Sequence, residues 1–198
     1  MNAKRVGAVV AVATALVVSI LFPLPMPAAI AEGAEPTAAQ TFGWGAPTRS
    51  EDFTGDLAQW SLYNGPGHDG NGRRTPSAVG VANGILTISG NAAGDSEGMA
   101  WGAGATYGRW EARMRASAGD PDYHAVLLLW PDNEDEGGYG GEIDFMENSD
   151  PTRQNTEMFV HYGDEDTQLQ GDVDVDATQW HNWAVEWSPD HIPAYLDG

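Results

Sequence analysis

The run Ala125-Val126-Leu127-Leu128-Leu129-Trp130 decides the fold class. An unbroken apolar run of this length predicts a β-strand covered on both faces, as in the inner sheet of a sandwich. Residues 108–116 alternate instead, with apolar side chains on one face and charged side chains on the other. That period of two predicts a half-buried strand.

Further short segments of strand character lie between turn residues along the chain. They are residues 84–89, 124–130, 142–147, 156–161, 181–187 and 192–196. No stretch shows a convincing helical period, and no internal repeat is visible. The 198 residues include Gly 25, Pro 12 and Trp 8, a mixture typical of all-β folds. We therefore predict one all-β domain of packed antiparallel sheets.

Composition and charge exclude several classes of function. With 41% hydrophobic and 10% aromatic residues the chain is typical of a packed globular protein. A formal charge of -20 would repel a phosphate polymer, so we expect no nucleic-acid partner. Because Cys is 0, the chain contains no disulfide, iron-sulfur cluster or thiolate zinc site.

The first residues have the pattern of a targeting segment. Lys4 and Arg5 precede the apolar residues 6–22, and Ala29-Ile30-Ala31 offers small residues for a signal peptidase. We predict a secretory signal at 1–31, an extracellular location and no stable membrane association after cleavage; the alternative is an uncleaved membrane anchor. Residues 32–48 are predicted to be a flexible lead, and 49–198 the domain.

Most acidic residues have the pattern of exposed loops. Residues 132–136 and 164–166 are charge runs beside glycines. Asp172-Val173-Asp174-Val175-Asp176 resembles the first half of a calcium loop, but Ala177 and Trp183 stand where glycine and glutamate are needed. We therefore predict no metal in the site and no required cofactor, and leave open a structural calcium in another geometry.

Gly140-Gly141-Glu142-Ile143-Asp144-Phe145-Met146-Glu147 is different, because three acids lie within an apolar strand. On a regular strand Glu142 and Asp144 share a face, and one β-bulge would bring Glu147 to it. Mutual repulsion should raise at least one carboxyl pKa, so that one group holds a proton near neutral pH. A protonated acid beside a carboxylate is suited to cleaving glycosidic bonds. The alternative is a plain amphipathic strand.

Residues 142–147 resemble the E-x-D-x-x-E signature of glycoside hydrolase family 16, the laminarinase-like group of concanavalin-like β-jelly-roll enzymes. Four further segments resemble the family in the right order. They are Asp52-Phe53-Thr54-Gly55 with Trp60, Tyr107-Gly108-Arg109-Trp110-Glu111-Ala112-Arg113, residues 181–190, and Tyr195-Leu196-Asp197-Gly198. The resemblance runs from about Asp52 to the last residue.

The resemblance implies roles for the three acids. Glu142 is the expected nucleophile, Glu147 the general acid/base, and Asp144 the group that tunes the nucleophile. Retention at the anomeric carbon requires carboxyl groups about 5 Å apart. His161 matches a family histidine that reaches the cleft; its alternative role is that of a hydrogen-bonded structural histidine.

Aromatic side chains are expected to bind sugar rings by stacking. The candidates are Trp101, Tyr123, Trp130 and Trp183, each with core packing as the alternative. Where the family often has W-P-A-x-W, this chain has Tyr123-His124-Ala125-Val126-Leu127, so the second tryptophan is lost. The resemblance favours a β-1,3-glucan or mixed β-1,3/1,4-glucan as substrate. The alternatives are a β-galactan of the agar or carrageenan type, and a non-catalytic polysaccharide-binding jelly roll.

The last two residues, Asp197-Gly198, form a typical hairpin-turn dipeptide. The resemblance implies further strands after such a turn, so we expect the sequence to be a C-terminally truncated, incomplete form of the domain. We also expect a monomer whose partner is a polysaccharide.

Overall fold

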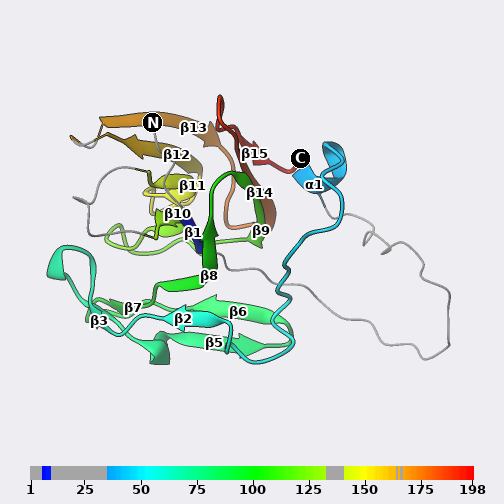
Figure 1. Cartoon of the computed structure of the whole chain (residues 1–198). Helices are drawn as coiled ribbons and strands as arrows, with labels where there is room; N and C mark the ends of the chain where they lie inside the picture. The colour runs from blue at the N-terminus through cyan, green and yellow to red at the C-terminus, as the bar shows by residue number, and fades with distance from the viewer. Residues whose placement is uncertain (1–5, 10–34, 133–140, 164, 166) are drawn as a thin grey trace, which may run out of the picture.

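The computed structural model describes residues 6–9, 35–132, 141–163, 165 and 167–198. Within these residues the predicted all-β architecture is confirmed, since antiparallel strands form two main sheets that share one hydrophobic core. Figure 1 shows the strands β9, β14 and β15 beside the stack of β10 to β13. Residues 133–140, which include most of the first acidic run, and residues 164 and 166 lie outside the described residues.

The large sheet has seven strands in the order β13-β12-β11-β10-β1-β8-β2. They are β1 (Val6–Val9), β2 (Trp60–Leu62), β8 (Met99–Ala105), β10 (Ala125–Pro131), β11 (Ile143–Asn148), β12 (Asn155–Tyr162) and β13 (Thr167–Asp174). The second sheet has the order β15-β14-β9, formed by β9 (Gly108–Met114), β14 (His181–Trp187) and β15 (Ala194–Leu196).

Shorter strands form the part of the molecule drawn below β8 in Figure 1. One small sheet joins β3 (Gly65–Pro66), β4 (Arg73–Arg74) and β7 (Asp95–Ser96), and a hairpin joins β5 (Val79–Ala82) to β6 (Ile85–Ile88). The hairpin turn is Asn83-Gly84, with φ 53 and 71. These are the two residue types that adopt positive φ most readily, so the turn is encoded locally. Single 3-10 turns lie at η1 (His68–Gly70) and η2 (Pro76–Ala78).

The core lies between the two main sheets. Leu127 and Leu129 of β10 are 1% and 0% exposed, and they pack in one cluster with Trp183 and Val185 of β14. Val126, Leu128 and Trp130 alternate to the other face and are only half-buried. The apolar run therefore has one face in the core and one face that is partly open.

All seven strand segments predicted from the sequence are strands in the structure. Two long strands were not predicted. Strand β13 has eight exposed residues and no buried face, and it pairs with β12 at all eight positions. Strand β8 is rich in Gly and Ala, which are weak signals of a strand.

The segment predicted as a flexible lead contains the short helix α1 (Ala38–Thr41). Thr37 caps its first turn, and Gln40 completes a capping box. The helix is docked on the second sheet, because the Ala38 N–H donates to the Glu111 carboxylate at 2.6 Å and Ala38 is 1% exposed. Asn182 also donates to the carbonyl of Pro36. Residues 35–41 are therefore packed against the domain in this structure.

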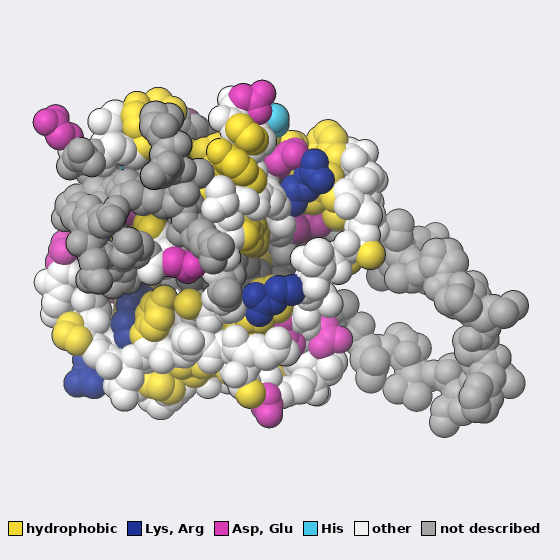
Figure 2. Space-filling model, viewed as in Figure 1, with side chains coloured by type: hydrophobic (Ala, Val, Ile, Leu, Met, Phe, Trp, Pro, Cys, Tyr) yellow, Lys and Arg dark blue, Asp and Glu magenta, His cyan; other side chains and the backbone are white. Residues whose placement is uncertain are grey.

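Strand β1 belongs to the predicted secretory signal, whose other residues lie outside the described part of the chain. It pairs antiparallel with both β10 and β8, so its backbone lies between them in the large sheet. No helix in the described residues is both long and apolar enough to cross a bilayer. Acidic side chains are scattered over the face of the molecule seen in Figure 2.

Candidate active site

Strand β11 contains two of the three predicted acids, and its pairing with β10 contains a β-bulge. Asp144 and Met146 lie opposite consecutive residues of β10, so Phe145 is an extra residue on β11. Phe145 and Met146 are 2% and 0% exposed, and both belong to the core cluster. The predicted bulge is confirmed. Because the side chains of Phe145 and Met146 both point into the core, the next residue, Glu147, lies on the same face of the strand as Asp144.

Cross-strand pairing identifies the other side chains on this face, which we call the acid face. On β12, Phe159 lies opposite Asp144 and Glu157 lies opposite Glu147. Partners in a sheet share a face, and so do residues two apart in one strand. His161 is therefore on the acid face as well.

Glu142 comes directly before β11 and continues its pairing with β12. The His161 N–H donates to the Glu142 carbonyl at 2.9 Å, and the Gly141 N–H donates to the His161 carbonyl at 3.0 Å. Gly141 has φ 118, a conformation that only glycine adopts readily. The strand alternation, together with the charge interaction between Glu142 and Asp144, places Glu142 on the acid face.

Asp144 lies between the two glutamates and is 3% exposed. Burial raises the pKa of Asp144 to about 8, with further contributions from the charges of Glu142 and Glu147 and a hydrogen bond with Glu142. A hydrogen bond that raises a carboxyl pKa is one made by the protonated form. At neutral pH Asp144 therefore keeps its proton and donates it in a hydrogen bond to the Glu142 carboxylate. One acid of the three holds a proton, as the sequence predicted.

His161 is in contact with this group of acids. Its Nε2 lies 3.4 Å from Oδ2 of Asp144 and 3.5 Å from Nε2 of Gln168 on β13. The side chain of His161 is 19% exposed, so it borders the acids without being sealed in the core. The structure thus brings His161 to the predicted catalytic residues.

Glu142, Asp144 and His161 could also act together on a metal ion, because their donor atoms lie within 4.8 Å of one another. Calcium takes about six to eight oxygen ligands, and this group offers two carboxyls and an imidazole. A calcium ion at this group would need further oxygen ligands. At the predicted partial calcium loop, the Asn155 amide donates to Asp174 at 3.0 Å, so a protein donor already binds that carboxylate.

Glu147 has a partner that sequence reasoning missed. Nδ1 of His124 lies 2.8 Å from Oε1 of Glu147, with the two side chains 41% and 20% exposed. His124 stands where the resembling family often has proline, so the sequence did contain a signal. From the sequence alone, that departure indicates only the loss of a tryptophan at Leu127.

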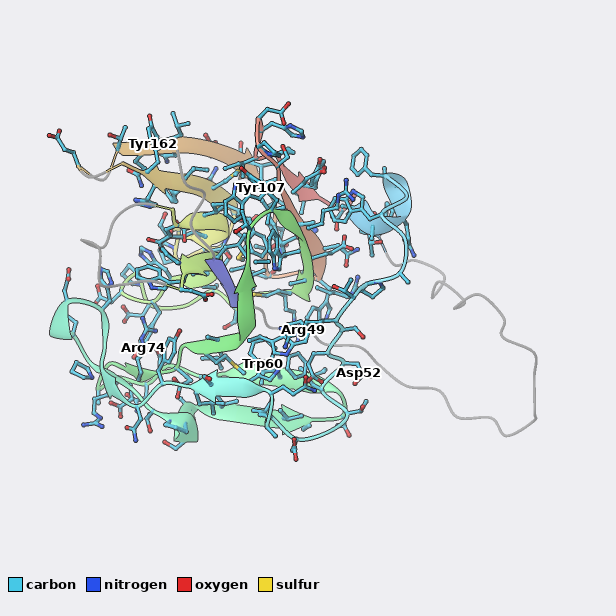
Figure 3. The ribbon with its side chains drawn as sticks, viewed as in Figure 1. Arg49, Asp52, Trp60, Arg74, Tyr107 and Tyr162 are labelled. Atoms are coloured by element: carbon cyan, nitrogen blue, oxygen red, sulfur yellow. The ribbon has the colours of Figure 1, made fainter. Side chains whose placement is uncertain are left out.

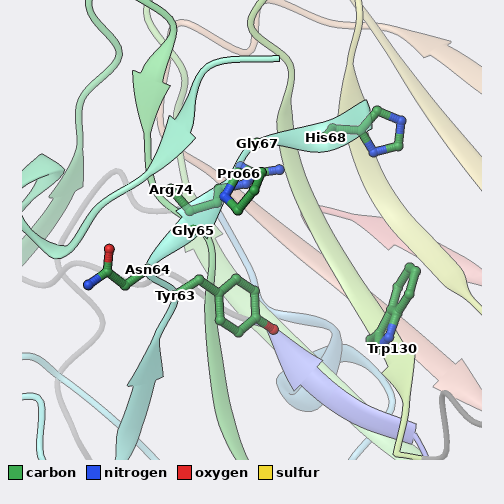
Figure 4. Close-up of a pocket in the computed structure, with 8 residues that line it drawn as sticks. All are labelled: Tyr63, Asn64, Gly65, Pro66, Gly67, His68, Arg74 and Trp130. Atoms are coloured by element: carbon green, nitrogen blue, oxygen red, sulfur yellow. The ribbon is translucent and has the colours of Figure 1, made fainter. Parts of the chain in front are cut away.

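Trp130 is on the face of β10 that continues the acid face, two residues from Leu128, the partner of Asp144. It lines an open cavity of about 530 Å³. The other lining residues come from the loop and strands around β3 and β4: Tyr63, Asn64, Gly65, Pro66, Gly67, His68 and Arg74. Figure 4 shows the Trp130 and Tyr63 rings on opposite sides of this space. Trp130 is therefore placed to contact a ligand that lies along the acid face.

Trp101 and Tyr123 have mainly structural contacts. Trp101 stacks on Trp60 with ring centroids 5.3 Å apart, and the Arg49 guanidinium lies 4.7 Å from the Trp101 ring; Figure 3 labels Trp60 and Arg49 side by side. The Tyr123 hydroxyl donates to the Asn91 carbonyl at 2.7 Å. The Trp101 ring thus packs where β2 pairs with β8, and the Tyr123 hydroxyl holds the loop that contains Asn91.

Trp183 is not at the acid face. It is 2% exposed in the core on β14, and its indole N–H donates to the Met114 carbonyl at 3.3 Å. A ring held between the two sheets cannot stack on a sugar, so the core alternative describes Trp183. The reason is that β14 belongs to the second sheet.

Comparisons with known proteins identify the family and the fold. Residues 74–198 match the family described as Glycosyl hydrolases family 16. A β-glucanase of Rhodothermus marinus is 32% identical over 108 residues, which are 46% of this chain and 35% of that protein. The chain thus spans about a third of the length of this curated relative.

Two solved structures share the fold. The laminarinase catalytic domain of Thermotoga maritima has a TM-score of 0.62 and 21% identity, over 75% of this chain and 72% of that one. A pseudo β-1,3-glucanase of Mycobacterium tuberculosis has a TM-score of 0.55 and 22% identity, over 75% and 70%. With the family match covering more than half of its residues, the chain belongs to glycosyl hydrolases family 16.

Proposed function

We propose that this chain belongs to the catalytic domain of a secreted hydrolase. The enzyme would cleave internal bonds of β-1,3-glucan or mixed β-1,3/1,4-glucan and retain the anomeric configuration. The observation that supports this best is the bulge in β11. It brings Glu147 to the face of Glu142 and Asp144, where burial and charge keep Asp144 protonated between two glutamates. An amphipathic strand has no need of such a bulge.

In the proposed reaction an oxygen of the Glu142 carboxylate forms a bond to the anomeric carbon, while the bond to the leaving oxygen breaks. Glu147 gives its proton to that oxygen. In the second step Glu147 takes a proton from water, and the water oxygen replaces Glu142 at the anomeric carbon. Asp144 donates its hydrogen bond to Glu142 and holds the nucleophile in one orientation.

The similar proteins support a glucan as the substrate. The curated relative is a β-glucanase, and one of the solved structures is a laminarinase catalytic domain. The open cavity at Trp130 supports a chain-binding cleft, because sugar rings stack on aromatic faces and find hydrogen-bond donors at the rim. A β-galactan is the alternative substrate for the same arrangement of acids.

A second candidate function is polysaccharide binding without hydrolysis. The observation that favours it is the structural likeness to a protein described as a pseudo β-1,3-glucanase. Fold alone does not separate the two functions, because the same sandwich serves enzymes and lectins.

Reducing-sugar release from β-1,3-glucan, mixed-linkage glucan, agar and carrageenan tests the proposal. The proteins to compare are the full-length wild-type protein and its variant Glu142→Gln. We expect hydrolysis of a β-1,3-containing glucan by the wild type, and a loss of several orders of magnitude in the variant with oligosaccharide binding retained. Binding by the wild type without hydrolysis would favour the lectin-like function. Hydrolysis of galactans alone would replace the proposed substrate.

Secretion is tested by the mass of the extracellular protein, which should begin at residue 32 if the predicted signal is removed. Cleavage there would also remove β1 from between β8 and β10. An extracellular product that retains residues 1–31 would contradict the predicted signal.

A further inference from the structure

We propose that His124 is a positioning residue for Glu147: its Nδ1–H donates to one carboxyl oxygen and leaves the other oxygen to carry the proton to the leaving group. This role rests on the proposed hydrolase function. It concerns the acid/base and not the nucleophile, so it can be tested apart from Glu142.

The contact between His124 and Glu147 is direct. Nδ1 and Oε1 are 2.8 Å apart, a usual hydrogen-bond distance. A protonated carboxyl has a carbonyl oxygen that accepts and a hydroxyl that donates. If Nδ1–H of neutral His124 occupies the accepting oxygen, Glu147 presents its hydroxyl to the glycosidic oxygen in one defined orientation.

Strand register explains why the two side chains meet. Val126 lies opposite Glu147, and His124 is two residues before Val126 on the same side of β10. A residue two positions from the direct partner is a diagonal neighbour, within reach of a long side chain. The bulge at Phe145 and Met146 creates this meeting, because it brings Glu147 to that side.

A buried arginine fixes the backbone on both sides of the contact. Arg153 is 4% exposed and donates from Nη2 to the Tyr123 carbonyl at 2.8 Å and from Nη1 to the Asn148 carbonyl at 2.7 Å. Tyr123 directly precedes His124, and Asn148 directly follows Glu147. One planar guanidinium thus holds the two strand ends at a fixed separation, so the His124–Glu147 distance is built into the fold.

Three variants separate a positioning role from a structural one. His124→Ala removes the donor. His124→Asn keeps an N–H near the place of Nδ1. The matched control is His191→Asn, in the loop after β14, where His191 contacts Ser188 and Asp190. Each variant is compared with the full-length wild-type protein for kcat and KM on laminari-oligosaccharides at neutral pH, and thermal unfolding verifies the fold.

We expect His124→Ala to lower kcat about 100-fold at neutral pH, the effect of a misplaced catalytic group, with KM changed less than about threefold. His124→Asn should restore kcat to within about tenfold of the wild type, because its amide N–H occupies the same carboxyl oxygen of Glu147. His191→Asn should match the wild type. Glucan hydrolysis by the wild type, with an unchanged kcat in His124→Ala or with a kcat in His124→Asn as low as in His124→Ala, would overturn the role of His124 alone. A full-length wild-type protein that hydrolyses no glucan would overturn the proposed function and this role together.

Discussion

Replacing Asp144 by asparagine should remove most of one pH-dependent contribution to stability. The folded protein holds a proton on Asp144 up to about pH 8, whereas the ordinary pKa of an aspartate, taken for the unfolded chain, is 3.8. Between these two pKa values the folded state binds one more proton than the unfolded state. Stability therefore falls as the pH rises through this range. The asparagine of the variant would resemble the protonated acid at every pH, because its amide can still donate to Glu142.

The magnitude follows from the pKa of Asp144, which is raised from 3.8 to about 8. One proton corresponds to about 1.4 kcal/mol of unfolding free energy for each pH unit. Between pH 5 and pH 7 the wild type should thus lose about 3 kcal/mol relative to Asp144→Asn. For a domain of this size that loss corresponds to about 6 to 12 °C in Tm.

Thermal unfolding followed by circular dichroism at pH 5, 6 and 7 measures this difference. The matched control is Asp69→Asn in the η1 turn, an exposed carboxylate whose side chain is 81% accessible. The unfolding free energy of Asp144→Asn should rise relative to that of the wild type with each pH unit. The unfolding free energy of Asp69→Asn should remain within about 0.5 kcal/mol of the wild-type value. Parallel curves for the wild type and Asp144→Asn would refute the assignment of the proton to Asp144.

Three other substitutions test further parts of the account. Glu147→Gln should slow substrates with poor leaving groups far more than activated aryl glycosides, and azide should partly restore turnover of the latter; equal losses would contradict an acid/base role. Trp183→Ala should cost about 3 to 5 kcal/mol in urea unfolding because a core ring is lost, and a change in KM without such a cost would contradict core placement. Arg153→Met should leave buried carbonyls unpaired and cost at least about 3 kcal/mol; a smaller loss in urea unfolding would show that Arg153 does not fix these strands.

Hydrophobic patterning predicted the strands that bury apolar side chains in the core. The β9 alternation and the β11 acids could be interpreted locally, and the bulge followed from the need to bring Glu147 to the face of Asp144. Strand β13 could not be found in this way, because all its residues are exposed and its conformation depends on pairing with β12. The helix α1 is only four residues long, too short to show a helical period.

The sequence could not decide which aromatic side chains face a ligand. Trp130 and Trp183 both lie in apolar strands, and their different placement arises from the face of the strand that each occupies and from the sheet to which the strand belongs. β14 has four consecutive buried residues because the core covers one face and the segment before and within α1 covers the other. The contact between His124 and Glu147 could not be predicted from the sequence either, because it depends on the register between β10 and β11, which no local pattern specifies.

Mass spectrometry of the labelled protein tests the central claim most directly. The reagent is a 2-deoxy-2-fluoro laminari-oligosaccharide with a dinitrophenyl leaving group, and the intact mass and the peptide masses are both measured. The fluorine slows hydrolysis of a covalent glycosyl-enzyme, so a retaining enzyme accumulates it. We predict one added glycosyl group on the wild-type chain, located on Glu142 and absent in Glu142→Gln. A chain that hydrolyses β-1,3-glucan but gains no mass, or that gains it on another residue, would contradict the assignment of Glu142 as the nucleophile.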